Sequence, residues 1–194
     1  MLKKQRENAV DDGIEYADDD EDSIMYLARL RIPSLVIGLV LGFALSFLTS
    51  RFEQVLAKDI RIAFFIPFIV YMADAVGTQT QGIYVRDLRT GKASFKKYLL
   101  KESALGFVLG LGSSILSGVV TYIWFRSYDI VLAVSLSMFA AVLVAPLVAL
   151  LVTEILQLEH SDPAVGSGPI ATVIQDTLSI LIFGLIASAI ILHA

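Results

Sequence analysis

The sequence contains no cysteine, which excludes disulfides, thiolate metal sites and cysteine nucleophiles. Charged residues are also scarce, since Asp, Glu, Lys and Arg make up 18% of the 194 residues while hydrophobic residues make up 56%. Soluble domains are about 45–50% apolar, so the excess indicates a membrane protein. The N-terminus shows no basic stretch followed by a short apolar run and a cleavage site, so we expect no cleaved signal peptide.

Five long segments are almost free of charge, and a helix needs about 20 apolar residues to cross the hydrocarbon core of a bilayer. The segments are 32–50, 62–85, 103–125, 130–153 and 164–192. Lipid cannot satisfy the backbone of irregular segments, so spanning segments of this kind must be helical. The predicted fold class is therefore an all-α membrane protein, a five-transmembrane-helix bundle that occupies residues 29–194 as one domain.

Lys and Arg predict the orientation of this bundle. The N-terminal flank and the loop between the second and third segments together carry eleven of them, and the opposite side carries four. The positive-inside rule therefore predicts a multi-pass plasma-membrane protein with a cytoplasmic N-terminus and an extracellular C-terminus. The loop before the fifth segment instead holds Glu154, Glu159, His160 and Asp162. This loop predicts an acidic vestibule on the cytoplasmic side.

Residues 1–28 form a separate acidic region, with nine carboxylates and three basic residues among the first 22. Such a density of like charge, with few apolar residues to pack, is typical of a solvated and largely disordered tail. A weak cytoplasmic attractor of divalent cations is the alternative, because hard cations prefer oxygen ligands. The spacing of an EF-hand is absent, so any binding would be loose.

Two aspartates lie inside otherwise uncharged segments. Asp74 is the only charged residue of 62–85, and Asp176 is the only one of 164–192. An ionised carboxylate at membrane depth costs about 2.5–3.5 kcal/mol on insertion scales, and such residues usually mark an ion or proton pathway. For Asp176 the alternative is a neutral acid hydrogen-bonded to a neighbouring helix. For Asp74 a structural role is a poor explanation, because no Lys or Arg lies at a similar depth to pair with it.

Polar residues accompany both aspartates on a helical face. Asp74, Thr78 and Gln81 follow an i, i+4, i+7 spacing, which places them on one side of a helix. A polar stripe in a membrane helix must face protein or water rather than lipid. For Gln79 and Gln81, hydrogen bonding between helices is an equally good explanation.

The fifth segment starts with a run rich in Pro and Gly, at 162–169. This run predicts a loosened or late-starting helix whose free carbonyls can face an ion or its water. Further along, Thr172, Asp176 and Ser179 again share one helical face. The functional interpretation of Asp176 is therefore a carboxylate of a pore or transport site.

These segments carry a resemblance to a known family. The run 67–88, with Gly-Thr-Gln at 77–79 and Val-Arg-Asp-Leu at 85–88, resembles the second transmembrane helix of the MgtE magnesium channels. The run 162–169 followed by Asp176 is similar to the start and middle of their fifth helix. The resemblance covers about residues 29–192, the transmembrane domain only. It also extends to the magnesium transporters of the solute-carrier type, which lack the large cytoplasmic regulatory domains of the bacterial members, as we expect for this chain.

The resemblance implies a homodimer whose second and fifth helices line one central pore, with Mg²⁺ as the transported and bound ion and Asp176 as the main selectivity carboxylate. Two departures from the family pattern concern neighbouring positions. Ala75 replaces the expected asparagine, and Asp74 adds a carboxylate. The addition would strengthen cation binding, change selectivity or couple transport to protons. A proton- or Na⁺-coupled exchanger that uses the same aspartates is therefore the alternative function.

The candidate residues follow from both lines of reasoning. The candidate metal-binding residues are Asp176, Asp74, Thr78, Thr172, Gly77 and Ala75. The candidate pathway and vestibule residues are Gln79, Gln81, Ser167, Gly168, Ser179 and Asp162.

Other functional classes fit the sequence less well. An intramembrane aspartyl enzyme, with Asp74 and Asp176 as a shared-proton pair, would need a Gly-x-Gly-Asp motif, which is absent, so we expect no enzymatic activity. A non-transporting assembly subunit would leave two buried acids unexplained. We expect membrane lipid and a second copy of the chain as partners, and neither nucleic acid nor a small organic substrate.

Overall fold

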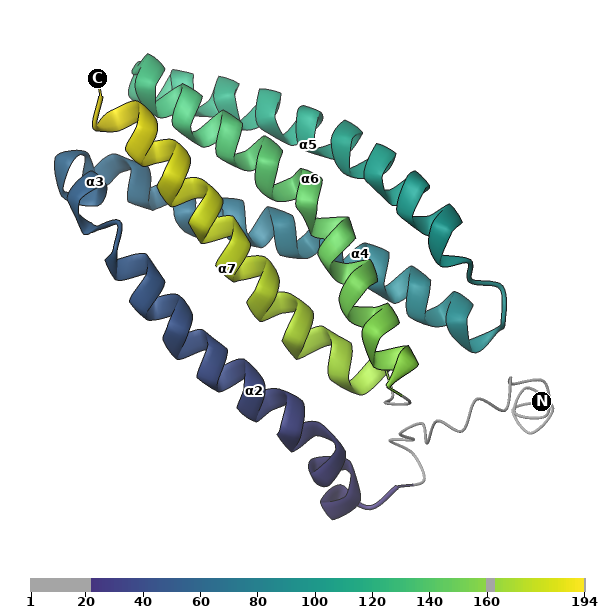
Figure 1. The fold of residues 1–194 in the computed structure, drawn as a ribbon. Coiled ribbons are helices and arrows are strands. Elements are labelled where there is room, and N and C mark those ends of the chain that lie inside the picture. The colour runs from purple at the N-terminus through teal and green to yellow at the C-terminus, as the bar shows by residue number, and fades with distance from the viewer. Residues whose placement is uncertain (1–21, 160–162, 194) are drawn as a thin grey trace.

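The computed structural model describes residues 22–159 and 163–193, with side chains from 167 onward in the second range. The described chain folds into the helices α2 (Ile24–Ser50), α3 (Glu53–Lys58), η1 (Ile60–Phe65), α4 (Ile66–Arg89), α5 (Phe95–Phe125), α6 (Tyr128–Leu158) and α7 (Pro163–Ile191). Five of the helical segments, one of them η1 with α4, are long and apolar enough to cross a membrane (Figure 1). The predicted all-α fold with five membrane-spanning helices is thus confirmed.

The helices extend beyond the uncharged segments that predicted them. The hydroxyl of Ser23 accepts a hydrogen bond from the backbone N–H of Tyr26 over 3.3 Å, so α2 begins at Ile24 and includes Arg29. This start lies within the region expected to be part of the acidic tail, whose first 21 residues fall outside the described chain. In the same way α5 begins at Phe95, eight residues before the uncharged segment. Lys and Arg near a helix end can bury their stems and keep their charge in water, so charge marks the membrane boundary rather than the helix end.

Helix α6 forms the centre of the bundle. It packs against α4, α5 and α7, and half of its most apolar stretch is buried, against 6% for α2, which packs mainly on α7 (Figure 1). Small residues permit this close packing, as is usual between membrane helices. A methyl group added at Gly106 of α5 would lie 2.9 Å from the carbonyl oxygen of Leu143 in α6. The position therefore admits only glycine without a shift of the backbone.

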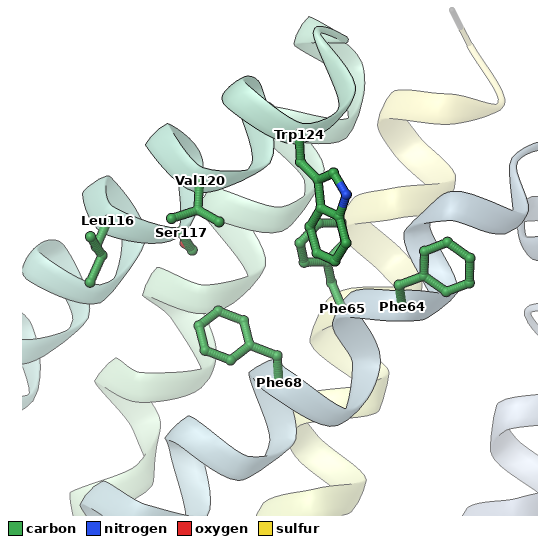
Figure 2. A pocket seen from close by; sticks show the side chains of 7 residues that line it. All are labelled: Phe64, Phe65, Phe68, Leu116, Ser117, Val120 and Trp124. Carbon is green, nitrogen blue, oxygen red and sulfur yellow. The ribbon is translucent and has the colours of Figure 1, made fainter.

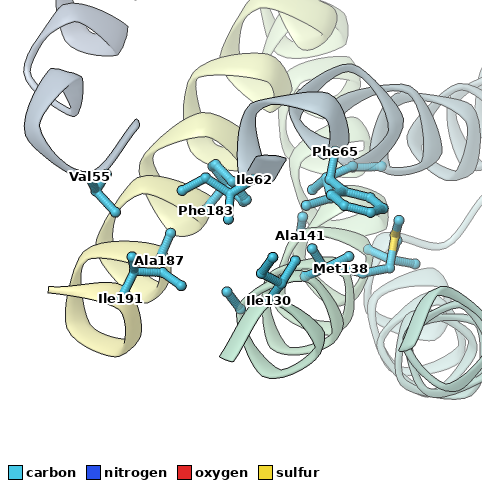
Figure 3. Close-up of a cluster of buried hydrophobic side chains, with 14 of the residues drawn as sticks. Val55, Ile62, Phe65, Ile130, Met138, Ala141, Phe183, Ala187 and Ile191 are labelled. Carbon is cyan, nitrogen blue, oxygen red and sulfur yellow. The ribbon is translucent and has the colours of Figure 1, made fainter. Parts of the chain in front are cut away.

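The largest apolar core lies at the end of the bundle where α2 ends and α6 begins. Figure 3 shows its side chains, which come from α3, η1, α4, α6 and α7. Labelled members are Val55, Ile62, Phe65, Ile130, Met138, Ala141, Phe183, Ala187 and Ile191. The opposite end holds the loop 90–94, the end of α6 and the start of α7 (Figure 1); we call it the 90–94 end.

Helices α4 and α5 diverge from the loop that joins them (Figure 1). Near the start of α4 and the end of α5, a pocket of about 380 Å³ separates them (Figure 2). Aromatic rings bridge this gap, with the centroids of Phe65 and Trp124 6.2 Å apart. The pocket lies in the membrane-spanning part of both helices and is lined almost wholly by apolar groups.

Helix α7 is continuous from Pro163, and the expectation of a late start is wrong. A proline fits the first turn of a helix because its missing N–H has no intrahelical partner there. Pro169 lies inside the helix, where a proline removes one backbone hydrogen bond. Residues 163–169 of the Pro- and Gly-rich run are therefore helical and leave one carbonyl free, rather than forming an unwound segment.

Candidate functional site

Helices α4 and α7 bring together the two polar faces that the sequence predicts. The hydroxyl of Thr172 donates a hydrogen bond to Oδ1 of Asp74 over 3.0 Å. Two helical turns further along α4, Nε2 of Gln81 donates to the hydroxyl of Ser167 over 2.7 Å. Ser167 is fully buried. Four of the predicted site residues therefore form the contact between these helices.

A small pocket lies beside this contact, between α4, α6 and α7. Its polar groups come from α4 and α7, while α6 supplies only alanine and valine. The lining residues are Asp74, Gly77, Thr78, Gln81, Ala145, Val148, Ala149, Ala171 and Gln175. The pocket therefore presents a carboxylate, a hydroxyl and two amides in an otherwise apolar surrounding.

The second carboxylate, Asp176, lies near the first. It lies one helical turn along α7 from Thr172, the residue that is hydrogen-bonded to Asp74. Its Oδ1 atom is buried and has no hydrogen-bond partner among the described residues. Neither aspartate forms an ion pair with a Lys or Arg of the described chain, where the ion pairs involve Asp59 and Asp87. Two like charges at short range in a medium of low dielectric repel strongly, so a cation or a proton must compensate them.

Of the other predicted site residues of α4, some are packed against neighbouring helices and others are exposed. Gly77 is buried against α6, since a methyl group added there would lie 3.4 Å from the carbonyl oxygen of Ala145. Ala75 is half-buried, whereas Thr78 and Gln79 are exposed. Exposed polar groups in a membrane-spanning helix face water or another protein surface. The polar face of α4 is thus only partly covered within one chain.

The remaining candidates lie on α7 or before it. Gly168 faces α4, with Nε2 of Gln81 3.7 Å from the position of an added methyl group. Ser179 is fully buried and accepts a hydrogen bond from Nε2 of Gln175 over 3.2 Å, and it does not line the pocket. Asp162 lies outside the described residues.

The sequence reasoning missed Gln175. This residue is 3% exposed, and its Nε2 also donates to the carbonyl oxygen of Ala141 over 3.4 Å. Its Oε1 atom has no partner in the described part of the chain, although the side chain lines the pocket. The amide of Gln175 within an otherwise apolar segment could have indicated a site residue. It was overlooked because Gln175 lies about 100° around the helix from the face of Asp176.

Glu154 differs from its expected place in an acidic loop. Helix α6 continues to Leu158, so Glu154 lies inside it. Its Oε2 atom accepts a hydrogen bond from the hydroxyl of Tyr84 over 2.5 Å. Glu154 therefore forms a contact between helices, a role that a hydropathy pattern does not reveal.

Five helices long and apolar enough to span a membrane, with two carboxylates on two of them that form no ion pair in the described chain, define a multi-pass membrane protein with acidic groups at membrane depth. Residues 66–186 match the model of the MgtE family, which is described as "Divalent cation transporter". This match covers more than half of the chain, and the chain therefore belongs to the MgtE family. The family is one of transporters rather than enzymes, in agreement with the prediction from the sequence.

The chain is also similar to three proteins named "Magnesium transporter MgtE". The protein of Bacillus subtilis is 29% identical over 174 residues, which are 88% of this chain and 39% of the relative. The protein of Enterococcus faecalis is 30% identical over 164 residues, 83% of this chain and 36% of the relative. The protein of Thermus thermophilus is 29% identical over 163 residues, 82% of this chain and 35% of the relative. The chain thus spans little more than a third of the length of each relative.

Proposed function

We propose that this chain transports divalent cations across the membrane, with Mg²⁺ as the physiological ion. The proposal rests above all on the pair Asp74 and Asp176, two carboxylates on neighbouring spans that form no ion pair with a basic residue of the described chain. Carboxylate, hydroxyl and carbonyl oxygens are the ligands that Mg²⁺ prefers. The family of the chain and the names of its relatives support the same ion.

The pathway in this proposal runs along the face shared by α4 and α7. Mg²⁺ dehydrates reluctantly and usually keeps several waters. The hydrated ion is too large for the small pocket beside Asp74, so we do not place the ion in that pocket. Instead Asp176, a half-buried carboxylate that forms no ion pair in the described chain, binds the ion through its water shell. Thr78 and Gln79, which are exposed on α4, provide polar contacts for the same waters.

A homodimer completes this pathway. Thr78 and Gln79 are exposed within one chain, and polar side chains at membrane depth require water or protein rather than lipid. A two-fold axis beside α4 and α7 would enclose a water-filled pore and bring two copies of Asp176 near each other. The doubled charge favours a divalent over a monovalent cation. In the proposed orientation the N-terminus is cytoplasmic, in the plasma membrane.

A second candidate function is exchange coupled to protons or Na⁺. It is favoured by Asp74, whose Oδ1 atom is already held by Thr172. This arrangement separates Asp74 from Asp176 in role, because one carboxylate is fixed inside the bundle and the other keeps a free oxygen. Asp74 would then bind the coupling ion and Asp176 the divalent cation.

The test is Mg²⁺ uptake into proteoliposomes with and without imposed pH and Na⁺ gradients. We compare the wild-type chain with Asp176→Asn and with the control Asp129→Asn, which removes an exposed carboxylate at the start of α6. Transport without an imposed gradient that is lost only in Asp176→Asn supports the channel. Transport that requires a gradient supports the exchanger. Equal uptake by both variants contradicts the role of Asp176.

A further inference from the structure

Two hydroxyl groups on the buried side of α4 donate hydrogen bonds to carboxylates of two other helices. Thr80 Oγ1 donates to Glu102 Oε2 of α5 over 2.7 Å, and the hydroxyl of Tyr84 donates to Glu154 Oε2 of α6 over 2.5 Å. Thr80, Tyr84 and Glu102 are all buried. Because Thr80 and Tyr84 are one helical turn apart, α4 is held at successive turns by two different helices.

A third bond of the same kind joins α4 and α5 at the 90–94 end. The hydroxyl of Tyr98 donates to Asp87 Oδ2 over 2.6 Å, and the rings of Tyr84 and Tyr98 lie with centroids 4.7 Å apart. Hydrogen bonds to a carboxylate are shorter and stronger than those between neutral groups. These three bonds and the ring contact together form a unit that we call the hydroxyl–carboxylate clamp, with members Thr80, Tyr84, Asp87, Tyr98, Glu102 and Glu154.

The packing of the rest of α4 indicates what the clamp does, which is to fix the rotation of α4 about its axis. Between the clamp and the start of α4, Gly77 packs against Ala145 of α6, and the buried face of α4 also carries Ile69, Ala73 and Val76. Helix α5 offers little support there, because α4 and α5 diverge from their loop and a pocket separates their other ends (Figures 1 and 2). The hydrogen bonds of Asp74 and Gln81 to α7 oppose rotation of α4 on one side, and the clamp bonds to α5 and α6 oppose it on the other.

Thr80 and Tyr84 lie roughly 80–120° around the helix from Asp74. A rotation of α4 would therefore move Asp74, Thr78 and Gln81 away from α7 as one unit. We propose that Glu102 and Glu154 are positioning residues of the cation pathway: through Thr80 and Tyr84 they fix the rotation of α4 and thereby set ion selectivity. This inference rests on the proposed function for its consequence in transport, while the rotation itself is measurable without transport.

The first test measures the rotation of α4 by thiol labelling. Because the chain has no native cysteine, only an introduced thiol reacts. Thr78→Cys and Gln79→Cys introduce single thiols at adjacent exposed positions of α4. We compare the ratio of their labelling rates in the wild-type background and with Thr80→Val and Tyr84→Phe combined. The ratio is expected to change about tenfold or more, because the combined variant loses two hydrogen bonds to carboxylates. An unchanged ratio overturns the inference, whether or not the chain transports Mg²⁺.

A matched control separates positioning from a general effect on stability. Thr121→Val removes a fully buried hydroxyl of α5 that donates only to the carbonyl oxygen of Ser117 in its own helix. It should leave the labelling ratio unchanged. Glu102→Gln keeps an oxygen that accepts the hydrogen bond from Thr80, so it should retain the wild-type labelling ratio. If Glu102→Gln changed the ratio and the combined variant of Thr80 and Tyr84 did not, a role for the hydrogen bond would be overturned.

The second test measures selectivity as the ratio of Mg²⁺ to Ca²⁺ flux in proteoliposomes. The combined variant of Thr80 and Tyr84 should lower this ratio about tenfold or more, whereas Thr80→Ser, which keeps the hydroxyl, should preserve it. A changed labelling ratio with unchanged selectivity overturns the link from the clamp to selectivity. Absence of Mg²⁺ flux in the wild-type chain contradicts the proposed function instead, and the labelling result then still decides whether the clamp fixes α4.

Discussion

Thr172 donates a hydrogen bond to Asp74 over 3.0 Å, which joins residues 98 positions apart in the sequence. The bond links α4 and α7 in the middle of the membrane-spanning region, next to a second carboxylate with a buried, unpartnered oxygen. One aspartate is thus partly satisfied within the chain and the other is not. Their different surroundings give the two acids different roles in the proposed function.

Replacement of Thr172 by valine tests this difference. Thr172→Val keeps the shape of the side chain but leaves Asp74 without its donor. Hydrogen bonds to charged groups contribute about 1.5–3 kcal/mol, so we expect Mg²⁺ flux to change by about tenfold or more. Thr177→Val is the matched control on the same helix, because the hydroxyl of Thr177 donates only to the carbonyl oxygen of Val173. Flux assays in proteoliposomes compare the two, and equal effects would argue against a special role of Thr172.

Mg²⁺ should stabilise the folded protein if Asp176 binds it. A ligand that binds only the native state adds about 2.7 kcal/mol at a concentration 100 times its Kd. We therefore expect the thermal unfolding temperature in detergent to rise with Mg²⁺ and to fall again after chelation with EDTA. Asp129→Asn should behave like the wild-type chain. A persistent rise in Asp176→Asn would show that Mg²⁺ binds elsewhere.

Two glycines of α5 offer a matched test of the helix packing. A methyl group at Gly106 would lie 2.9 Å from a backbone carbonyl oxygen of α6, whereas one at Gly112 would meet nothing within 4 Å. Overpacking costs about 1–3 kcal/mol, so Gly106→Ala should unfold at a lower temperature. Gly112→Ala should unfold at the same or a higher temperature, because alanine favours a helix over glycine by about 0.5–1 kcal/mol. Equal unfolding temperatures in the two variants would contradict the close contact of α5 with α6.

The loop before η1 should contribute a pH-dependent part of the stability. Asp59 accepts hydrogen bonds from the backbone and the guanidinium of Arg61, at distances of 2.6–3.1 Å. These bonds to Arg61 lower the pKa of the Asp59 carboxyl below its ordinary value of 3.8. The folded state thus favours the ionised carboxylate more than the unfolded state does. This contribution to stability is complete above pH 3.8 and is lost as the pH falls through the lower pKa of the folded state.

The variant Asp59→Asn should therefore be less stable than the wild-type chain at pH 7, by at most about 1 kcal/mol for a pair this close to the surface. The difference should shrink only below about pH 4, where the wild-type carboxylate becomes protonated. Unfolding temperatures measured from pH 7 to pH 3 provide the comparison. A difference that disappears already near pH 6 would contradict the role of this carboxylate.

The sequence by itself determined the membrane class, the five spans and the two intramembrane aspartates. Each of these depends on local composition, because the cost of moving a charge into lipid applies whatever the neighbouring helices are. The shared face of Asp74, Thr78 and Gln81 also follows from helical periodicity alone. The ends of the helices did not follow, since α5 begins with charged residues that stay near the membrane surface.

Only the tertiary structure decided which side chains meet. Thr80 and Glu102, and Tyr84 and Glu154, are hydrogen-bonded pairs. Both pairs depend on how α4 rotates and crosses its neighbours, and no periodicity encodes that choice. Whether a buried polar atom finds a partner is likewise a property of packing, and it leaves Oδ1 of Asp176 without one in the described chain. Composition and periodicity act along one helix, whereas the partners of a buried oxygen are set by all the helices around it.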